Sequence, residues 1–284
     1  MNFLKSLYKF LSPKYQKLFL EYKVNFLPRY GHGRLPHDLL YERINSNRTI
    51  YASYLGKFLA EKAKLHMIKT SDKEKSETEP CWNNGFLPGL DIVALYSFIG
   101  IFQPKKYIEI GSGNSTKVVR KAIKDNNLLT KIISIDPVPR AQIDMLADEV
   151  IRQPLEKLHD LSFTEQLHAN DILFVDNSHR CFPNSDVTVC FLEILPKLKP
   201  GVIVHIHDIY LPYDYPQFMA DRFYSEQYLL ACYLLASKDK FKIIMPNYFV
   251  SEDKELAEII APVWEHPDLK GVEKHGGSFW FIVS

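Results

Sequence analysis

The stretch from Tyr107 to Thr116, which reads YIEIGSGNST, constrains the fold of this chain more than any other segment. It begins with β-forming residues, breaks at Gly111 and Gly113, and continues into a helical pattern that runs to Lys124. A strand that passes through glycines into a helix N-terminus leaves free backbone N–H groups beside a cleft. Nucleotide-like ligands bind at such turns in open α/β sheets.

Strands and helices alternate from residue 107 to the C-terminus. Strands are predicted at 107–110, 131–136, 149–152, 171–176, 202–207, 241–245 and 278–283. Helices are predicted at 187–198 and 216–237, and an acidic helical insertion at 252–264. This alternation is typical of a parallel sheet with right-handed crossovers. We therefore predict a Rossmann-like, doubly wound α/β fold around a mostly parallel seven-stranded sheet.

Acidic and histidine side chains lie at the ends of several predicted strands. The carboxyl ends of parallel strands form the edge at which α/β sheets bind ligands. An acid about twenty residues after a glycine turn can accept hydrogen bonds from ribose hydroxyls, and Asp136 has that spacing. The side chains at these ends are Glu109, Asp136, Asp176, His179, His205, His207 and Asp208.

Two nucleotide sites fit the glycine turn. A dinucleotide oxidoreductase needs G-x-G-x-x-G, and here Thr116 stands at the third glycine, so that pattern is incomplete. Residues 109–115 resemble the first motif of class I S-adenosylmethionine (SAM)-dependent methyltransferases, with Ser115 in place of the last glycine. The resemblance continues in DILFVD at 171–176 and LKPG at 198–201, and covers residues 81–284. The chain is also similar to bacterial members of this class whose fifth strand ends in His-Asp and whose last segment contains Gly-Gly-Ser-Phe-Trp. Here these motifs stand at 207–208 and 276–280.

The resemblance implies SAM as the cofactor and an antiparallel last strand. The glycine turn would wrap the amino-acid part of the cofactor, above the acid of the first strand. The acid after the second strand would hold the ribose hydroxyls, and residues 155–156 would lie near adenine. The implied cofactor-binding residues are Glu109, Gly111, Ser112, Gly113, Asp136 and Glu156.

The implied activity is methyl transfer to an oxygen, with nitrogen as second choice, of a small molecule or sugar. The expected catalytic residues are Asp176, His179, His207 and Asp208. Metal-dependent O-methyltransferases of the catechol and caffeoyl-coenzyme-A type look similar here, so Asp176, His207 and Asp208 are candidate ligands of a divalent ion. A histidine ligand favours Mn²⁺ or Zn²⁺ over Mg²⁺. Alternatively His207 or His179 is a general base without a metal, or the group is a structural hydrogen-bonded pair.

Two loops are predicted to flank this edge. Residues 81–90 are rich in Asn, Gly and aromatic residues and either fold over a ligand or cap the next helix with Asp91. Residues 210–216 contain three tyrosines and two prolines, which suit either an acceptor pocket or a stiff connection. His205 shares a strand face with His207 and is expected to pack in the core.

The first 80 residues are predicted to form a helical extension and linker, and residues 81–284 the methyltransferase-like domain. Residues 1–24 are basic and amphipathic, and are read either as a helix docked on the body or a second subunit, or as a weak membrane-surface contact. Residues 36–68 are a second helical region. Residues 71–80 are rich in Lys, Glu and Ser, which indicates a solvated linker.

The amino-acid composition limits the classes of partner and the cellular compartment that we expect. The formal net charge of +1 gives no global attraction for nucleic acid. The four cysteines include no C-x-x-C pair and fit a reduced, cytoplasmic chain. A small-molecule or sugar acceptor and a homo-oligomer are the partners expected. A non-catalytic scaffold of the same fold and an NAD-dependent oxidoreductase stay open as alternatives.

Overall fold

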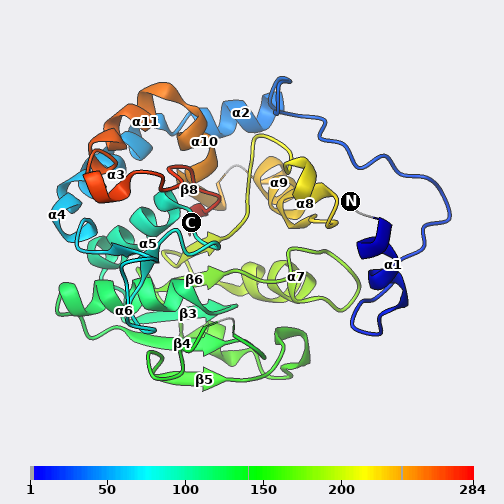
Figure 1. Cartoon of the computed structure of the whole chain (residues 1–284), viewed down its shortest axis with the longest axis horizontal. Helices are drawn as coiled ribbons and strands as arrows, with labels where there is room; N and C mark the ends of the chain where they lie inside the picture. Colours follow the sequence, from blue (N-terminus) through cyan, green and yellow to red (C-terminus); the bar gives the residue numbers. More distant parts are fainter. Residues whose placement is uncertain (1–2, 140, 238) are drawn as a thin grey trace.

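The computed structural model describes residues 3–139, 141–237 and 239–284, with side chains from residue 7 onward. Its centre is a seven-stranded sheet in the order β5-β4-β3-β6-β7-β9-β8 (Figure 1). Only β9 runs antiparallel to its neighbours, β7 and β8, in this sheet. The strands are β3 (Lys106–Ile110), β4 (Lys131–Ile135), β5 (Glu149–Ile151), β6 (Ile172–Val175), β7 (Ile203–Ile206), β8 (Phe241–Pro246) and β9 (Phe279–Val283). The predicted doubly wound, mostly parallel sheet is confirmed.

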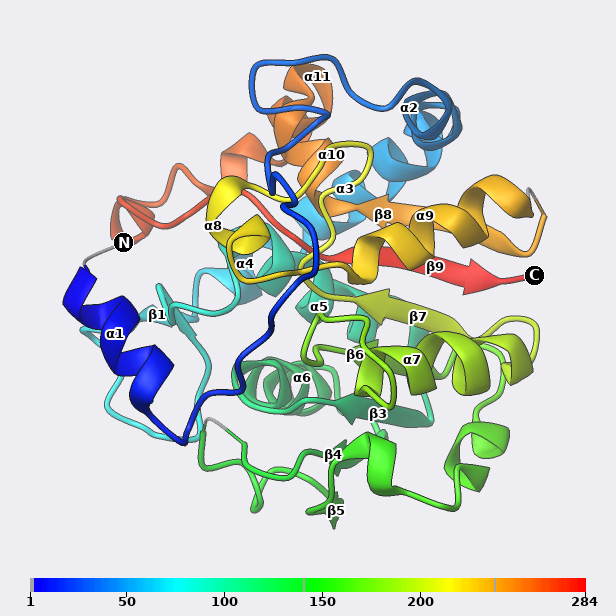
Figure 2. The ribbon, with the colours of Figure 1, turned by 90° about the vertical axis from the view of Figure 1, so that its right-hand side faces the viewer.

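Helices cover both faces of this sheet. In Figure 2, α5 and α6 lie on one face, and α7 and α9 lie on the other. The helices are α1 (Phe3–Leu11), α2 (Asp38–Asn45), α3 (Arg48–Ala60), α4 (Lys62–Leu65), α5 (Gly89–Phe102), α6 (Asn114–Asp125), α7 (Asp186–Val189), α8 (Gln217–Ala220), α9 (Glu226–Ala236), α10 (Asn247–Glu252) and α11 (Lys254–Ile260).

Burial on both faces explains the apolar strands. All four residues of β6 are buried, as expected for a central parallel strand. Helix α5 is apolar all round because it lies between other elements instead of facing solvent. On its outer side, Tyr54 and Phe58 of α3 pack edge-to-face against Phe98 of α5.

The N-terminal helices α2, α3 and α4 contribute to the same hydrophobic core as the sheet. Arg48 at the start of α3 pairs with Asp253 and Glu255 beside α11, which ties the helices to the C-terminal part. Residues 71–80 form the connection between β1 (Lys69–Thr70) and β2 (Cys81–Trp82), two short strands that pair in parallel. The domain boundary at residue 80 stays a prediction.

Three helix predictions were wrong in extent. The segment 216–237 forms two helices, because Phe223 adopts φ +62° between α8 and α9. The segment 187–198 changes from α7 through a π turn to a 3₁₀ turn that contains Pro196, which has no N–H to donate. The first helix ends at Leu11, ahead of Pro13, and residues 1–2 of the predicted amphipathic segment lie outside the described residues.

Asp91 does not cap helix α5. The N-cap position is Pro88, and the buried Asp91 carboxylate accepts hydrogen bonds from the backbone N–H groups of Gly277 and Ser278, at 2.8 and 2.9 Å. Asn247 donates a third bond to it at 2.7 Å. Asp91 therefore fixes the chain before β9, close to the ends of the central strands.

Among the described residues, no helix combines the length and the apolar character needed to cross a membrane. The four cysteines, Cys81, Cys181, Cys190 and Cys232, are free thiols.

Candidate functional site

The turn after β3 brings three strands together. Gly111 adopts φ +82°, and a Cβ there would lie 1.8 Å from the carbonyl oxygen of Asp176. The Gly111 N–H donates to Ile135 of β4 at 2.9 Å, and the Ser112 N–H donates to the Asp136 carboxylate at 2.8 Å. Only glycine allows this close approach of the turn to the end of β6.

Glu109 lies beneath the turn as expected and is fully buried. Its carboxyl group accepts hydrogen bonds from the hydroxyls of Thr116 and Ser115, and the Thr116 hydroxyl accepts one from the Gly113 N–H at 3.2 Å. Burial dominates over these donors and raises the pKa of Glu109 to about 8. The protonated carboxyl thus supports the loop through Thr116 and does not line the cleft above it.

The raised pKa makes stability depend on pH. An unfolded glutamate loses its proton near pH 4.3, so between there and about pH 8 the folded protein holds one proton more than the unfolded chain. Glu109 therefore lowers the free energy of unfolding by roughly 1.4 kcal/mol for each pH unit gained in that window. We expect Glu109→Gln to flatten the slope measured by urea unfolding, and exposed Glu165→Gln to leave it unchanged. Equal slopes in all three proteins would contradict the buried-proton explanation.

A cleft of about 330 Å³ opens beside the glycine turn. The predicted cofactor residues Gly111, Ser112, Asp136 and Glu156 line it, together with Leu155. They come from the turns after β3, β4 and β5, which the parallel register brings to one edge. Glu109 and Gly113 are not among the lining residues of this cleft.

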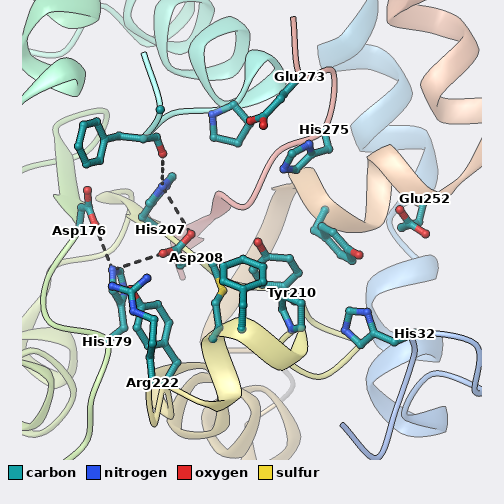
Figure 3. Close-up of a pocket in the computed structure, with 18 residues that line it drawn as sticks. His32, Asp176, His179, His207, Asp208, Tyr210, Arg222, Glu252, Glu273 and His275 are labelled. Atoms are coloured by element: carbon teal, nitrogen blue, oxygen red, sulfur yellow. Dashed lines mark hydrogen bonds and ion pairs between the residues drawn. The ribbon is translucent and has the colours of Figure 1, made fainter. Parts of the chain in front are cut away.

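A larger pocket of about 730 Å³ lies next to the cleft. Its floor holds the four predicted catalytic residues Asp176, His179, His207 and Asp208, which follow β6 and β7 (Figure 3). Asp176 lines both the pocket and the cleft. The two cavities therefore meet at the carboxyl end of β6.

His179 lies between three carboxylates. Its Nε2 is 3.2 Å from Asp176 and 3.6 Å from Asp208, while Nδ1–H donates to Glu226 at 3.1 Å. Burial lowers the pKa of His179, but the hydrogen bonds to Asp176 and Glu226 and the charge of Asp208 outweigh it, so the pKa lies well above its usual value. His179 is therefore a cation at neutral pH, which disfavours it as a general base.

His207 is also buried, with its two ring nitrogens in different surroundings. Nε2 donates to the Phe86 carbonyl at 3.3 Å and lies 3.7 Å from Asp208. Nδ1 faces Asp91 at 3.8 Å and has no hydrogen-bond partner within the described part of the chain. Burial lowers the pKa of His207, but the carboxylates of Asp208, Asp176 and Asp91 raise it more, and the net pKa is above the usual value.

The donor set does not fit a divalent ion. Among the described residues, no group of three or more His, Cys, Asp or Glu side chains is arranged to hold a metal. The imidazolium of His179 already lies between Asp176 and Asp208, where a metal bound to both would sit. The predicted metal set of Asp176, His207 and Asp208 therefore gains no support from the geometry.

Residues of the two predicted loops enclose the pocket. Phe86 and Pro88 come from the loop before α5, and Tyr210 and Pro216 come from the loop after β7. His205, in contrast, is a core residue, stacked on Phe174 with a ring separation of 3.8 Å. Burial lowers the pKa of His205 well below its usual value.

Glu226 was missed by the sequence analysis. It is fully buried and binds both His179 and, at 2.8 Å, the amide of Asn177. In the sequence, Glu226 is a carboxylate at the start of an apolar helical run. This pattern is the same as that of an ordinary helix N-terminus, so it did not indicate a site residue. The break at Phe223 brings this residue to the site, because the Ser225 N–H bonds the His179 carbonyl at 2.9 Å.

The N-terminal region also reaches the pocket. The Asp214 carboxylate accepts hydrogen bonds from the backbone N–H groups of Arg29 and Tyr30, at 2.6 and 3.0 Å. His32 donates from Nε2 to the Asp214 carbonyl at 2.9 Å and lines the pocket opposite His179 (Figure 3). The N-terminal region thus contributes His32 to the wall of the pocket, a contribution that sequence patterns did not indicate.

Comparison with known proteins identifies the segment that builds the floor of the site. Residues 108–209, from β3 to just after β7, match the family model described as a methyltransferase domain. The segment is similar to a methyltransferase domain over less than half of the chain. It confirms the resemblance inferred from the glycine motif and contains all four predicted catalytic residues.

Two further likenesses were found. An uncharacterized protein from Archaeoglobus fulgidus is 35% identical over 96 residues, which cover 32% of this chain and 43% of that protein. The crystal structure of the SAH-bound Podospora anserina methyltransferase PaMTH1 aligns with 85% of this chain and 96% of its own, at 13% identity and a TM-score of 0.41. A likeness that distant carries no inference about function.

Proposed function

We propose that this protein transfers the methyl group of SAM to an oxygen of a small molecule or sugar, with nitrogen as the second choice of acceptor atom. The observation that supports it is the shared wall of the two cavities. Asp176 borders both the cleft at the methyltransferase glycine turn and the larger pocket. A donor in one cavity can therefore meet an acceptor in the other at a single point, as in-line transfer requires.

The residues of the cleft match the parts of SAM. The glycine turn at Gly111 and Ser112 lines the part of the cleft that suits the amino-acid portion of SAM, and the Asp136 carboxylate, which can accept more bonds than the one from the Ser112 N–H, suits the ribose hydroxyls. Leu155 and Glu156 also line the cleft, and this part suits the adenine. When bound, SAM supplies an electrophilic methyl group.

The pocket supplies deprotonation and positioning. When His207 is neutral with its remaining proton on Nδ1, toward Asp91 at 3.8 Å, Nε2 no longer donates to the Phe86 carbonyl and can take the proton of the acceptor hydroxyl. The cationic His179 holds Asp176 and Asp208 in place as hydrogen-bond acceptors for the substrate. Carboxylates beside the aromatic faces of Tyr210 and Tyr248 suit a polyhydroxylated ring such as a sugar.

Calorimetric titration with SAM tests the cofactor assignment. We expect micromolar binding that Asp136→Ala abolishes and that Asp160→Ala, an exposed acid elsewhere, leaves unchanged. NAD⁺ binding instead of SAM binding would favour the oxidoreductase alternative. Binding of neither would contradict the proposal and favour a scaffold.

The N-terminal wall should influence acceptor binding. We expect His32→Ala to raise KM for the acceptor by about 3- to 10-fold, because one polar contact is worth about 0.5–1.5 kcal/mol, and to leave SAM affinity unchanged. Steady-state kinetics with varied acceptor measures this change, and the exposed His159→Ala serves as control. An unchanged KM would mean that the acceptor does not reach this wall.

A further inference from the structure

Exposed apolar side chains are concentrated in the first part of the chain, which we call the N-terminal arm (residues 7–27). Leu11, Phe19 and Tyr22 have exposed fractions of 68%, 76% and 73%. Nine further large apolar residues of the arm are also exposed. A patch of this kind, on a protein whose other apolar residues build a large core, indicates a surface with a binding role.

Positive charge accompanies these apolar side chains. Lys9, Lys14, Lys17 and Lys23 are all exposed, and Glu21 is the only acid of the arm. The arm therefore carries a net charge of about +3, whereas the whole chain has +1. Lysines around an apolar surface match an anionic lipid interface. Binding to a nucleic-acid backbone would use the lysines but would leave the aliphatic residues exposed to water.

The arm has a defined shape that keeps its apolar groups outward. Helix α1 turns back on the segment that follows it, with Tyr8 against Tyr15 and Phe10 against Phe19 at ring separations of 6.3 and 6.4 Å. The ammonium group of Lys17 lies 5.7 Å from the Phe10 ring. These contacts order the arm without covering it.

An apolar groove of about 450 Å³ separates the arm from the body of the protein. Leu18, Leu20 and Val24 line it on the arm, and Phe182 and Phe223 line it on the body. Hydrocarbon fits such a groove better than a charged polymer does, which favours lipid as the occupant.

The arm lies on the same side of the molecule as the carboxyl ends of the strands. In Figure 1 α1 lies beyond the tips of the strand arrows, and in Figure 2 the arm crosses in front of that edge. Shortly after the arm, the chain is bonded to Asp214 at Arg29, and His32 lines the large pocket. A surface that binds the arm would therefore face the pocket side of the protein.

We propose that the N-terminal arm binds the surface of an anionic membrane, with its apolar side chains among the headgroups and its lysines at the lipid phosphates. This contact turns the pocket side of the protein toward the bilayer. It does not depend on which reaction the pocket carries out.

Vesicle flotation of the full chain tests this proposal. We expect the protein to float with phosphatidylcholine vesicles that contain phosphatidylserine, to stay behind with phosphatidylcholine alone, and to be released by added salt. Lys9→Glu/Lys14→Glu should weaken partitioning by about 30-fold or more, because each lysine near an anionic surface contributes roughly fivefold. Leu11→Ser/Phe19→Ser should also release the protein.

Lys197→Glu/Lys242→Glu is the matched control, because both lysines are exposed near the amino ends of strands, away from the arm. This control should float as the unaltered protein does, and equal thermal unfolding midpoints would show that all variants fold. Failure to bind anionic vesicles would overturn the proposal. Equal binding by the arm variants would also overturn it, as would an arm-dependent dimer in light scattering without vesicle binding.

Discussion

A His207→Gln variant will transfer methyl groups about 100- to 10,000-fold more slowly while binding SAM as tightly as the unaltered protein, because general-base catalysis contributes about that factor. Glutamine can still donate to the Phe86 carbonyl that His207 contacts at 3.3 Å, so the loop over the pocket stays in place. It cannot take a proton from the acceptor. Single-turnover rates and calorimetry separate these two effects.

His275→Gln is the matched control for this experiment. His275 also lines the pocket, but Figure 3 shows it apart from His179 and Asp176, toward Glu273. We expect the turnover rate of this variant to stay within about threefold of that of the unaltered protein, and any effect to appear in KM. His275 would contribute to binding and not to proton transfer. Equal losses in both variants would show that His207 acts through pocket shape alone.

The pH dependence of the reaction should follow the same residue. A base works only when unprotonated, and the carboxylates around His207 raise its pKa above the usual histidine value despite its burial. The rate should therefore increase with pH through that raised pKa, and this dependence should disappear in His207→Gln. A dependence that survives the substitution would assign the proton to another group.

A Gly111→Ala variant will lose about 4 kcal/mol of stability and its affinity for SAM, through one added methyl group. The left-handed φ of +82° costs alanine about 1 kcal/mol. The larger cost comes from the Cβ, which would lie 1.8 Å from the Asp176 carbonyl oxygen and would force β3 and β6 apart. Urea unfolding and SAM titration measure both losses.

Gly271→Ala separates the two contributions. Gly271 has a similar φ of +89°, but a Cβ there would meet no atom within 4 Å. This control should lose only about 1 kcal/mol and bind SAM normally. If Gly111→Ala and Gly271→Ala lose the same stability, the close approach of the glycine turn to β6 has no energetic importance.

Sequence patterns predicted the parts of the site that lie next to strand ends. Asp136, Asp176 and His207 each follow a strand directly, Asp208 comes next after His207, and parallel strands must bring their ends to one edge. Glu226 could not be found in this way, because its place depends on a helix break between α8 and α9 and not on a strand. The base was also undecided between His179 and His207 until the carboxylates around each were known.

The sequence by itself determined the sheet, the edge at which both cavities open and the identity of the polar groups there. These features depend on short-range periodicity and on residues a few positions apart, which the chain encodes locally. Only the tertiary structure decided which groups are charged and what encloses the pocket. Carboxylates up to 47 residues away stabilise the protonated form of His179. His32 reaches the pocket because the nearby backbone N–H of Arg29 is bonded to Asp214, 185 residues later in the chain. Such long-range contacts depend on packing and burial, which no local pattern records.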